Sequence, residues 1–122
     1  MKKLPIEIRQ SKIHGIGVFA TKDVAWGKEI IEYVGQILSP KEGARRVRFY
    51  DTIGVTYLFD LDGKRYIDGL VGGNISRFIN HSKLNPNCCC IKKNGGVYIY
   101  SYTDIKAGEE LTFDYEMDGL KP

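Results

Sequence analysis

The sequence lacks any apolar segment long enough to cross a bilayer. Its 122 residues are 43% hydrophobic and 27% charged, and no apolar run approaches the roughly 20 residues that a membrane-spanning helix needs. The basic start, Met1–Pro5, is not followed by the apolar stretch of a secretion signal. We therefore expect a protein that is not secreted and has no membrane partner.

Cysteine is also scarce, and its placement is informative. The three cysteines are adjacent, at Cys88, Cys89 and Cys90. An odd, contiguous set is not a disulfide framework. Neighbouring side chains on a strand point to opposite faces, so the three cannot easily converge on one metal ion. The pattern favours structural packing over zinc binding, predicts no metal site, and suits a reducing compartment.

A strong net charge is absent too. With 18 basic and 15 acidic residues, the formal net charge is +3. The clearest basic cluster is Arg45, Arg46 and Arg48, and short charge runs of this kind are usually solvated faces. We predict no specific nucleic-acid partner.

The pattern that is present consists of short apolar segments separated by turns, with 14 glycines. Two dipeptides, Asp62-Gly63 and Asn94-Gly95, are typical of tight hairpin turns because their residues tolerate positive φ. The predicted strands are Ile6–Arg9, Gly17–Ala20, Glu29–Ile37, Tyr57–Leu61, Arg65–Asp68, Cys89–Lys92, Val97–Tyr102 and Glu110–Phe113.

One helix is well signalled. Ser39 provides an N-cap, Pro40 occupies the first helical position and Glu42 the third, and the helix is predicted to run to about Tyr50. Many short strands with one clear helix, in a chain of one-domain length, predict a mostly-β domain of folded hairpins.

A faint internal repeat links two eight-residue segments. Residues Asp23–Ile30 and Asp104–Leu111 share the pattern D-[VI]-x-x-G-x-E-[IL]. Two short copies do not make a repeat architecture. We interpret them as two uses of the same turn, each leading into a strand.

Three segments contain residues suited to chemistry. In His14–Gly17 the glycines let the backbone approach a ligand closely, although a plain turn has the same composition. The apolar stretch from Gly73 to Ser82 contains Asn74, Arg77, Asn80 and His81. Buried polar groups need partners, so that stretch is either an internal network or the wall of a ligand site. His81 lacks the spaced partners of a metal ligand.

The third segment is Gly108–Tyr115, where Phe113 and Tyr115 share one face of a predicted strand. Two aromatic residues on one face are usually core. A tyrosine hydroxyl beside a cavity can instead orient a nucleophile or take part in proton transfer.

Taken together, these segments resemble the SET-domain protein-lysine methyltransferases. The resemblance spans about residues 5 to 116 and depends on the order and spacing of several motifs. The motifs are His14–Gly17, Glu32–Gly35, Tyr57–Asp62, Arg77–Ser82 with Asn85–Cys88, and Gly108–Tyr115.

The resemblance implies a single SET domain over residues 1–122, with a short C-terminal tail at 117–122. It implies a β-clip-like fold with a knot-like C-terminal crossing, one or two short helices, and S-adenosyl-L-methionine as the methyl donor. His14, Ile16 and Gly17 would line the donor pocket, with Tyr57 at its wall and Arg77 nearby. Asn80 would hold the amino-acid end of the donor, and the backbone at His81 would contact its adenine edge.

The resemblance also implies the catalytic residues. Tyr115 matches the family's catalytic tyrosine, and Tyr57 and Phe113 would shape the reaction site. Phe113 occupies a position where relatives have Phe or Tyr. Phenylalanine leaves space for added methyl groups, so we expect the enzyme to proceed beyond monomethylation.

The sequence departs from many relatives at Lys83, where they have cysteine, and it lacks their zinc-binding tail. A wall of the substrate channel would then come from residues 116–122, from the substrate or from a second subunit, so a homodimer is expected. Glu116 and Asp118 would attract a basic lysine-bearing peptide such as a histone tail, or another lysine-rich protein.

Two alternatives remain open: a catalytically inactive peptide-binding module of the same fold, and a small β structural domain that binds no cofactor. The expected location is cytoplasmic, or nuclear and chromatin-associated if the source is a virus or a eukaryote.

Overall fold

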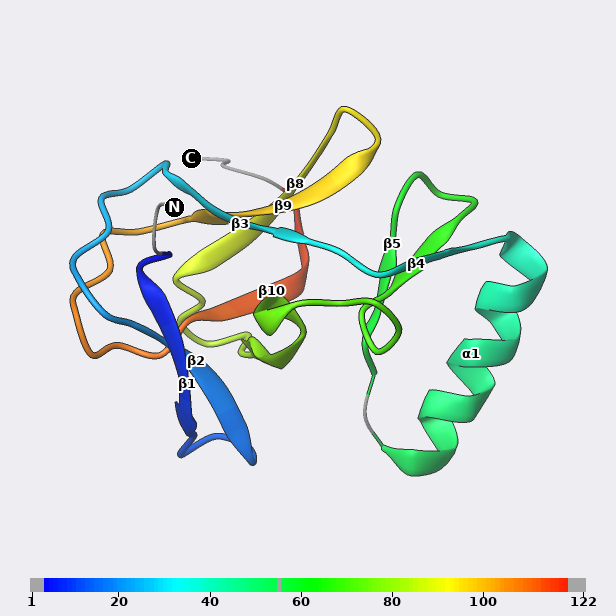
Figure 1. Ribbon diagram of the computed structural model, residues 1–122, viewed down its shortest axis with the longest axis horizontal. Helices are drawn as coiled ribbons and strands as arrows, with labels where there is room; N and C mark the ends of the chain where they lie inside the picture. Colours follow the sequence, from blue (N-terminus) through cyan, green and yellow to red (C-terminus); the bar gives the residue numbers. More distant parts are fainter. Residues whose placement is uncertain (1–3, 55, 119–122) are drawn as a thin grey trace.

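The computed structural model describes residues 4–54 and 56–118, and of residues 115–118 it describes only the backbone. Within these residues the fold is mostly β, with one α-helix and one 3-10 helix (Figure 1). In chain order the elements are β1 (Ile6–Gln10), β2 (Ile16–Ala20), β3 (Glu29–Tyr33), β4 (Gln36–Leu38), α1 (Pro40–Ile53), β5 (Leu58–Asp60), β6 (Tyr66–Asp68), η1 (Ile75–Phe78), β7 (Asn80–His81), β8 (Cys88–Lys93), β9 (Gly96–Ser101) and β10 (Thr112–Asp118).

Three sheets organise the strands. β1 and β2 form an antiparallel pair, β4, β6 and β5 form a three-stranded sheet, and the largest sheet has the order β3-β9-β8-β10-β7. The last strand, β10, lies between β8 and β7 and runs parallel to both. Phe113 is therefore in register with Cys88 on one side and with His81 on the other. This insertion brings the third motif beside the second, as the sequence resemblance implied.

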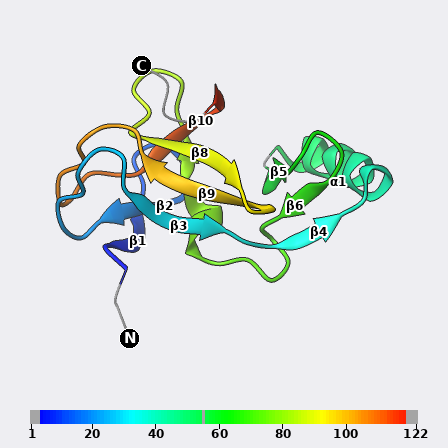
Figure 2. The ribbon, with the colours of Figure 1, turned by 90° about the horizontal axis from the view of Figure 1, so that it is seen from above.

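The predicted helix is confirmed and is longer than expected. The side chain of Ser39 accepts a hydrogen bond from the backbone N–H of Glu42, so the N-cap is as predicted. The helix continues past Tyr50 to Ile53 and ends at Gly54, whose φ of 77° suits glycine. Seen from above, α1 and the β4–β6–β5 sheet lie at one end, away from the β1–β2 hairpin (Figure 2). No helix within residues 4–54 and 56–118 is long and apolar enough to cross a membrane.

The single strand predicted over Glu29–Ile37 is wrong. It divides into β3 and β4, which belong to different sheets. The division falls at Gly35, where a Cβ atom would lie 2.2 Å from the carbonyl oxygen of Asp68. Only glycine permits this close approach of two backbone segments. Sequence reasoning also missed β7, a two-residue strand too short to show any periodicity.

Both predicted hairpin turns are present. Asp62-Gly63 lies in the connection between β5 and β6, and Gly63 has a φ of 82°. Asn94-Gly95 joins β8 to β9, with φ angles of 50° and 74°. Positive φ angles at both central residues are characteristic of the type I′ turn, whose twist matches that of the two flanking strands.

The internal repeat forms a pair of turns that bind each other. The backbones of Val24 and Ile105 exchange two hydrogen bonds, at 2.7 and 2.8 Å. The side chain of Asp104 accepts from the backbone N–H of Trp26, and Asp23 accepts in the same way from Ala107. The two copies thus supply each other's caps, which explains why the same residue types recur.

The hydrophobic core lies between the large sheet and its neighbours. Val18, Val97, Ile99 and Leu111 are among its fully buried members. Cys88 and Cys89 are also fully buried in this part of the molecule. Burial raises the pKa of the Cys88 thiol, which agrees with a packing role. Among the described residues, no group of three His, Cys, Asp or Glu side chains is arranged to hold a metal ion.

Candidate functional site

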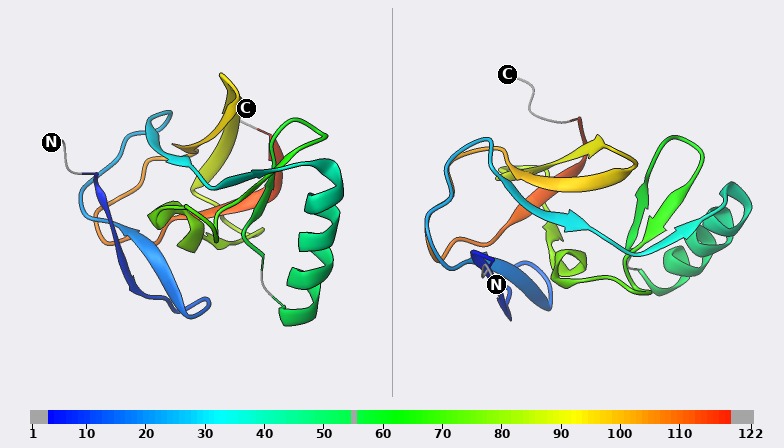
Figure 3. Two further views of the ribbon diagram at one scale, coloured as in Figure 1. Left: turned by 45° about the vertical axis from the view of Figure 1, so that its right-hand side comes forward. Right: turned by 45° about the horizontal axis from the view of Figure 1, so that its top comes forward.

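A cavity of about 540 Å³ lies where three segments meet. The first segment is the β1–β2 loop, the second is the connection from α1 to β5, and the third runs from η1 into β7. Both views of Figure 3 place η1 between the β1–β2 hairpin and α1. The lining residues are Ile13, His14, Gly15, Ile16, Gly54, Thr56, Tyr57, Arg77, Phe78, Ile79, Asn80 and His81.

Most of the residues predicted from the sequence to bind the cofactor share this cavity. Six of them line it: His14, Ile16, Tyr57, Arg77, Asn80 and His81. These residues come from positions 14 to 81, and their convergence depends on the tertiary fold. Their roles in binding remain predictions.

Three predicted residues do not line the cavity as described. Gly17 is in β2, where an added Cβ would stand 2.3 Å from the carboxylate of Glu110. Phe113 is 1% exposed, and its ring centroid is 5.4 Å from that of Phe59. The side chain of Tyr115 lies outside the described residues, although its backbone belongs to β10, the neighbour of β7.

Asn80 is the centre of a polar cluster at one end of the cavity. Its side-chain nitrogen lies 3.2 Å from the backbone carbonyl oxygens of His14 and Ile16. It also donates to Glu110 at 2.8 Å and approaches the Ser11 hydroxyl oxygen at 3.2 Å. Asn80 therefore ties β7 to the loop that carries the glycine motif.

Ser11 shapes that loop. Its hydroxyl oxygen accepts hydrogen bonds from the backbone N–H groups of Ile13 and His14, and its own N–H donates to the Gly15 carbonyl. Its hydroxyl group in turn lies 2.9 Å from both carboxylate oxygens of Glu110. Sequence reasoning missed Ser11 and Glu110 as site residues, because they are 99 positions apart and no local pattern connects them.

Tyr57 is held at the cavity wall through its backbone. Its carbonyl oxygen accepts a hydrogen bond from the Tyr33 hydroxyl at 2.6 Å and another from the Gly69 N–H at 2.9 Å. The ring of Tyr57 meets the ring of Tyr50 edge-on, with centroids 5.8 Å apart. This wall of the cavity is therefore coupled to α1.

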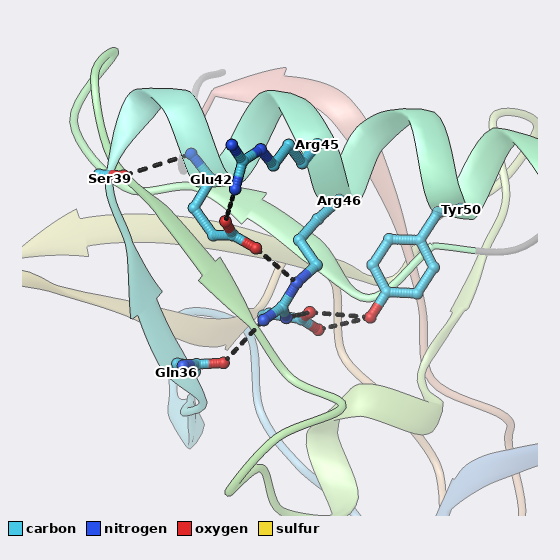
Figure 4. A network of polar contacts seen from close by, with 7 residues as sticks. Gln36, Ser39, Glu42, Arg45, Arg46 and Tyr50 are labelled. Atoms are coloured by element: carbon cyan, nitrogen blue, oxygen red, sulfur yellow. Dashed lines mark hydrogen bonds and ion pairs between the residues drawn. The ribbon is translucent and has the colours of Figure 1, made fainter.

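Helix α1 is anchored by a second polar cluster (Figure 4). Asp68 is fully buried and accepts hydrogen bonds from Arg46 at 2.5 Å and from the Tyr50 hydroxyl at 2.7 Å. Burial and the hydrogen bond to Asp68 raise the pKa of Tyr50 well above its ordinary value. Arg45 is exposed and pairs with Glu42, as expected for a solvated face, whereas Arg46 also pairs with the buried Asp68 and departs from that expectation.

The comparison with known families decides the identity of the fold. The family model of the SET domain matches residues 15–116. The chain belongs to the SET-domain family. The match covers every lining residue of the cavity except Ile13 and His14.

Similar proteins place this SET domain among much longer chains. It is 40% identical over 121 residues to histone-lysine N-methyltransferase set-2 of Caenorhabditis elegans, covering 94% of this chain and 8% of the relative. It is 42% identical over 126 residues to the H3 lysine-4 specific histone-lysine N-methyltransferase of Saccharomyces cerevisiae, covering 98% of this chain and 12% of the relative. The chain thus spans about a tenth of the length of these two relatives.

A solved structure agrees with the fold. The structure of ctPRC2 in an autoinhibited conformation bound to S-adenosylmethionine matches with a TM-score of 0.80 and 34% sequence identity. The match covers 94% of this chain and 15% of that chain. The predicted mostly-β SET fold is confirmed.

Proposed function

We propose that this chain is an S-adenosylmethionine-dependent protein-lysine N-methyltransferase. The observation that carries the proposal is the cavity at η1 and β7, which is lined by residues from three separate segments and includes Asn80. The SET-domain match and relatives named as histone-lysine N-methyltransferases support it.

The cavity has the chemistry that this donor requires. The lining residues His14 and Ile16 have backbone carbonyl oxygens 3.2 Å from the Asn80 side-chain nitrogen, and acceptors of this kind suit an ammonium group. The apolar side chains of Ile13, Ile16 and Phe78 line the cavity and suit the less polar parts of a nucleoside. When bound, S-adenosylmethionine supplies a methyl group carried on a positively charged sulfur.

The residues of the chain would position the donor and exclude water. The β1–β2 loop would cover it through the backbone of His14 and Ile16, while Asn80 would fix its amino-acid end. The backbone of His81 offers the donor and acceptor pair that an adenine edge needs. Each of these groups is in the cavity wall, so none has to move far to act.

The substrate lysine must reach the methyl group as a neutral amine. A free lysine side chain has a pKa of about 10.4, and burial next to a cationic sulfur favours the neutral form. Holding that amine in line with the methyl group removes much of the entropic barrier. The hydroxyl of Tyr115 would orient the reacting groups from β10, with Tyr57 at the cavity wall.

The finer assignments are also proposals. We propose a histone tail as the substrate, because the relatives are named for histone lysines, and a nuclear, chromatin-associated location follows from the same names rather than a cytoplasmic one. A homodimer would supply a further wall for the substrate channel. Sedimentation that shows only monomers at working concentration would remove the dimer.

Labelled-methyl transfer to a histone mixture tests the proposed activity. We expect transfer by the wild-type chain and a loss of at least about 100-fold for Tyr115→Phe, a magnitude typical of removing one preorganised transition-state group. Binding of the donor by calorimetry without any transfer would instead favour the inactive peptide-binding module. Absence of both binding and transfer would favour a structural domain.

Replacing Phe113 tests the expected degree of methylation. Phe113→Tyr adds a hydroxyl beside β7 and should shift the products toward monomethyl-lysine, as measured by mass spectrometry with excess donor. An unchanged product mixture would contradict the role proposed for Phe113.

A further inference from the structure

The carboxylate of Glu110 does not line the cavity but is hydrogen-bonded to Asn80, which does. It receives hydrogen bonds from the Ser11 hydroxyl and from the Asn80 side-chain nitrogen. Ser11 follows β1, Asn80 is in β7 and Glu110 precedes β10. One carboxylate therefore connects three segments that each contribute to, or border, the cavity.

The backbone around Glu110 is fixed on both sides. The side chain of Asn87 donates to the Glu110 carbonyl at 2.8 Å and accepts from the Thr112 N–H at 2.9 Å. On the other edge, the Leu111 N–H donates to the Val18 carbonyl at 2.7 Å. The carboxylate is consequently held at a set position relative to the loop.

The Asn80 side-chain nitrogen has fewer hydrogens than there are acceptor oxygens around it. The Asn80 side-chain nitrogen has two hydrogens, yet the oxygens of Ser11, His14, Ile16 and Glu110 all lie within 3.2 Å of it. The Ser11 oxygen already accepts from the Ile13 and His14 N–H groups, and two hydrogens cannot satisfy the other three acceptors with good geometry. The surplus acceptors, with one formal negative charge among them, suit an additional group that carries several N–H donors and a positive charge.

Glu110 differs from the other carboxylates of the polar clusters in its charge balance. Among the residues whose side chains the structure describes, no lysine, arginine or histidine forms an ion pair with Glu110, whereas Asp68 and Glu29 pair with Arg46 and Lys93. Glu110 is partly buried, so its field is screened less than that of a surface carboxylate. A cationic ligand would remove this imbalance.

Gly17 leaves room for the carboxylate. A Cβ at this position would lie 2.3 Å from the nearer carboxylate oxygen of Glu110 and 3.1 Å from the Asn80 nitrogen. Any other residue would push the carboxylate away from the loop. Glycine at position 17 therefore allows Glu110 to occupy its position, in addition to letting the backbone approach a ligand closely.

We propose that Glu110, oriented by Ser11, is a positioning and specificity residue for the α-ammonium group of the methyl donor. It acts from behind the cavity wall, by directing Asn80 and the loop carbonyls and by adding a negative charge beneath them. This inference rests on the proposed function, because it names the end of the donor that the cluster recognises.

Calorimetry with two nucleosides tests the inference. S-adenosylhomocysteine carries the α-ammonium group, and 5′-methylthioadenosine lacks the whole amino-acid end. For Glu110→Gln, which keeps the shape of the side chain and removes its charge, we expect affinity for S-adenosylhomocysteine to fall about tenfold or more. Affinity for 5′-methylthioadenosine should change less than about twofold, since a polar contact that is not used contributes little.

Two further variants keep the test interpretable. Glu109→Gln removes the charge of an exposed neighbour and should leave both affinities unchanged. Ser11→Ala removes the hydroxyl that orients the carboxylate and should reproduce the selective loss in weaker form, even if Glu110→Gln folds poorly. In transfer assays the defect of Glu110→Gln should appear as a higher KM for the donor with little change in kcat.

The possible outcomes separate the two proposals. An equal loss for both nucleosides, or no loss for either, overturns the role of Glu110 while leaving the proposed function intact. A wild-type chain that binds neither nucleoside overturns the proposed function and, with it, the inference.

Discussion

Two polar clusters of this domain each contain a carboxylate, Asp68 in one and Glu110 in the other, and they are built differently. Asp68 is fully buried, and its charge is met by Arg46 with further hydrogen bonds from Tyr50 and the Leu70 N–H. Glu110 is partly buried and receives only neutral donors from Ser11 and Asn80 among the described residues.

This difference in charge balance suggests different roles: the Asp68 cluster stabilises the fold, and the Glu110 cluster contributes to ligand binding. A carboxylate with its own cation and its own donors is complete within the fold, so it can anchor a helix to a sheet. A carboxylate held by neutral donors beside surplus acceptors keeps part of its interaction capacity for a ligand. Substitutions at the Asp68 cluster should therefore change stability, and substitutions at the Glu110 cluster should change binding.

Asp68→Ala should have the largest effect on stability. It leaves the Tyr50 hydroxyl without its acceptor and Arg46 without its counter-charge, and we expect the free energy of unfolding to fall by about 3 kcal/mol. Urea denaturation measures the change. Asp51→Ala, at an exposed position of α1, is the matched control and should stay within about 0.5 kcal/mol of wild type. Similar losses for both variants would contradict the anchoring role.

Two glycine substitutions should have different main effects, one on stability and the other on donor affinity. In Gly43→Ala the new Cβ would lie 2.0 Å from the Tyr66 ring, so stability should fall by about 1 to 2 kcal/mol even though alanine favours helix. In Gly17→Ala the Cβ displaces the flexible end of Glu110. Donor affinity should therefore fall several-fold, while the urea midpoint changes less than for Gly43→Ala. A larger loss of stability in Gly17→Ala, together with a larger loss of donor affinity in Gly43→Ala, would contradict the proposed difference between the two clusters.

Tyr50→Phe should cost about 1 kcal/mol at neutral pH, because it removes one hydrogen bond to Asp68. Burial and that hydrogen bond raise the pKa of Tyr50 in the folded state, so its contribution is fully present below the unfolded pKa of about 10. The contribution is lost progressively as pH rises from about 10 toward the higher pKa of the folded state. Denaturation midpoints between about pH 9 and 12 should therefore decline more steeply for wild type than for the variant. Parallel declines would show that Tyr50 does not contribute.

The smallest effect is expected at the start of α1. Ser39→Ala removes the N-cap acceptor for the Glu42 N–H and should lower stability by about 1 kcal/mol or less, without altering donor affinity. Lys41→Ala, two residues further along the chain at an exposed position, is the control. A loss of donor affinity in Ser39→Ala alone would show that the two clusters are coupled through the α1–β5 connection.

Much of the fold could be predicted from local sequence. The cap at Ser39 and the turns at Asp62-Gly63 and Asn94-Gly95 are correct, because each depends on conformational preferences of a few adjacent residues. The end of α1 was placed too early at Tyr50. The break at Gly35 was missed because it is caused by Asp68, a residue distant in the chain.

The members of the candidate site were predictable in part, and their arrangement was not. The order of motifs identified Asn80, His81 and the His14–Gly17 loop, and all of these except Gly17 line one cavity. The partners that hold them were not identified, because Ser11 and Glu110 meet only after β10 has entered between β7 and β8.

By itself, the sequence determined which turns form, where the helix begins and which residue types are available for binding, because backbone preferences and side-chain chemistry act over a few neighbouring positions. Only the tertiary structure decided which carboxylate is paired with a cation and which is left to neutral donors. That distinction depends on distances between segments far apart in the chain, such as Ser11 and Glu110, and is set by how the sheets assemble.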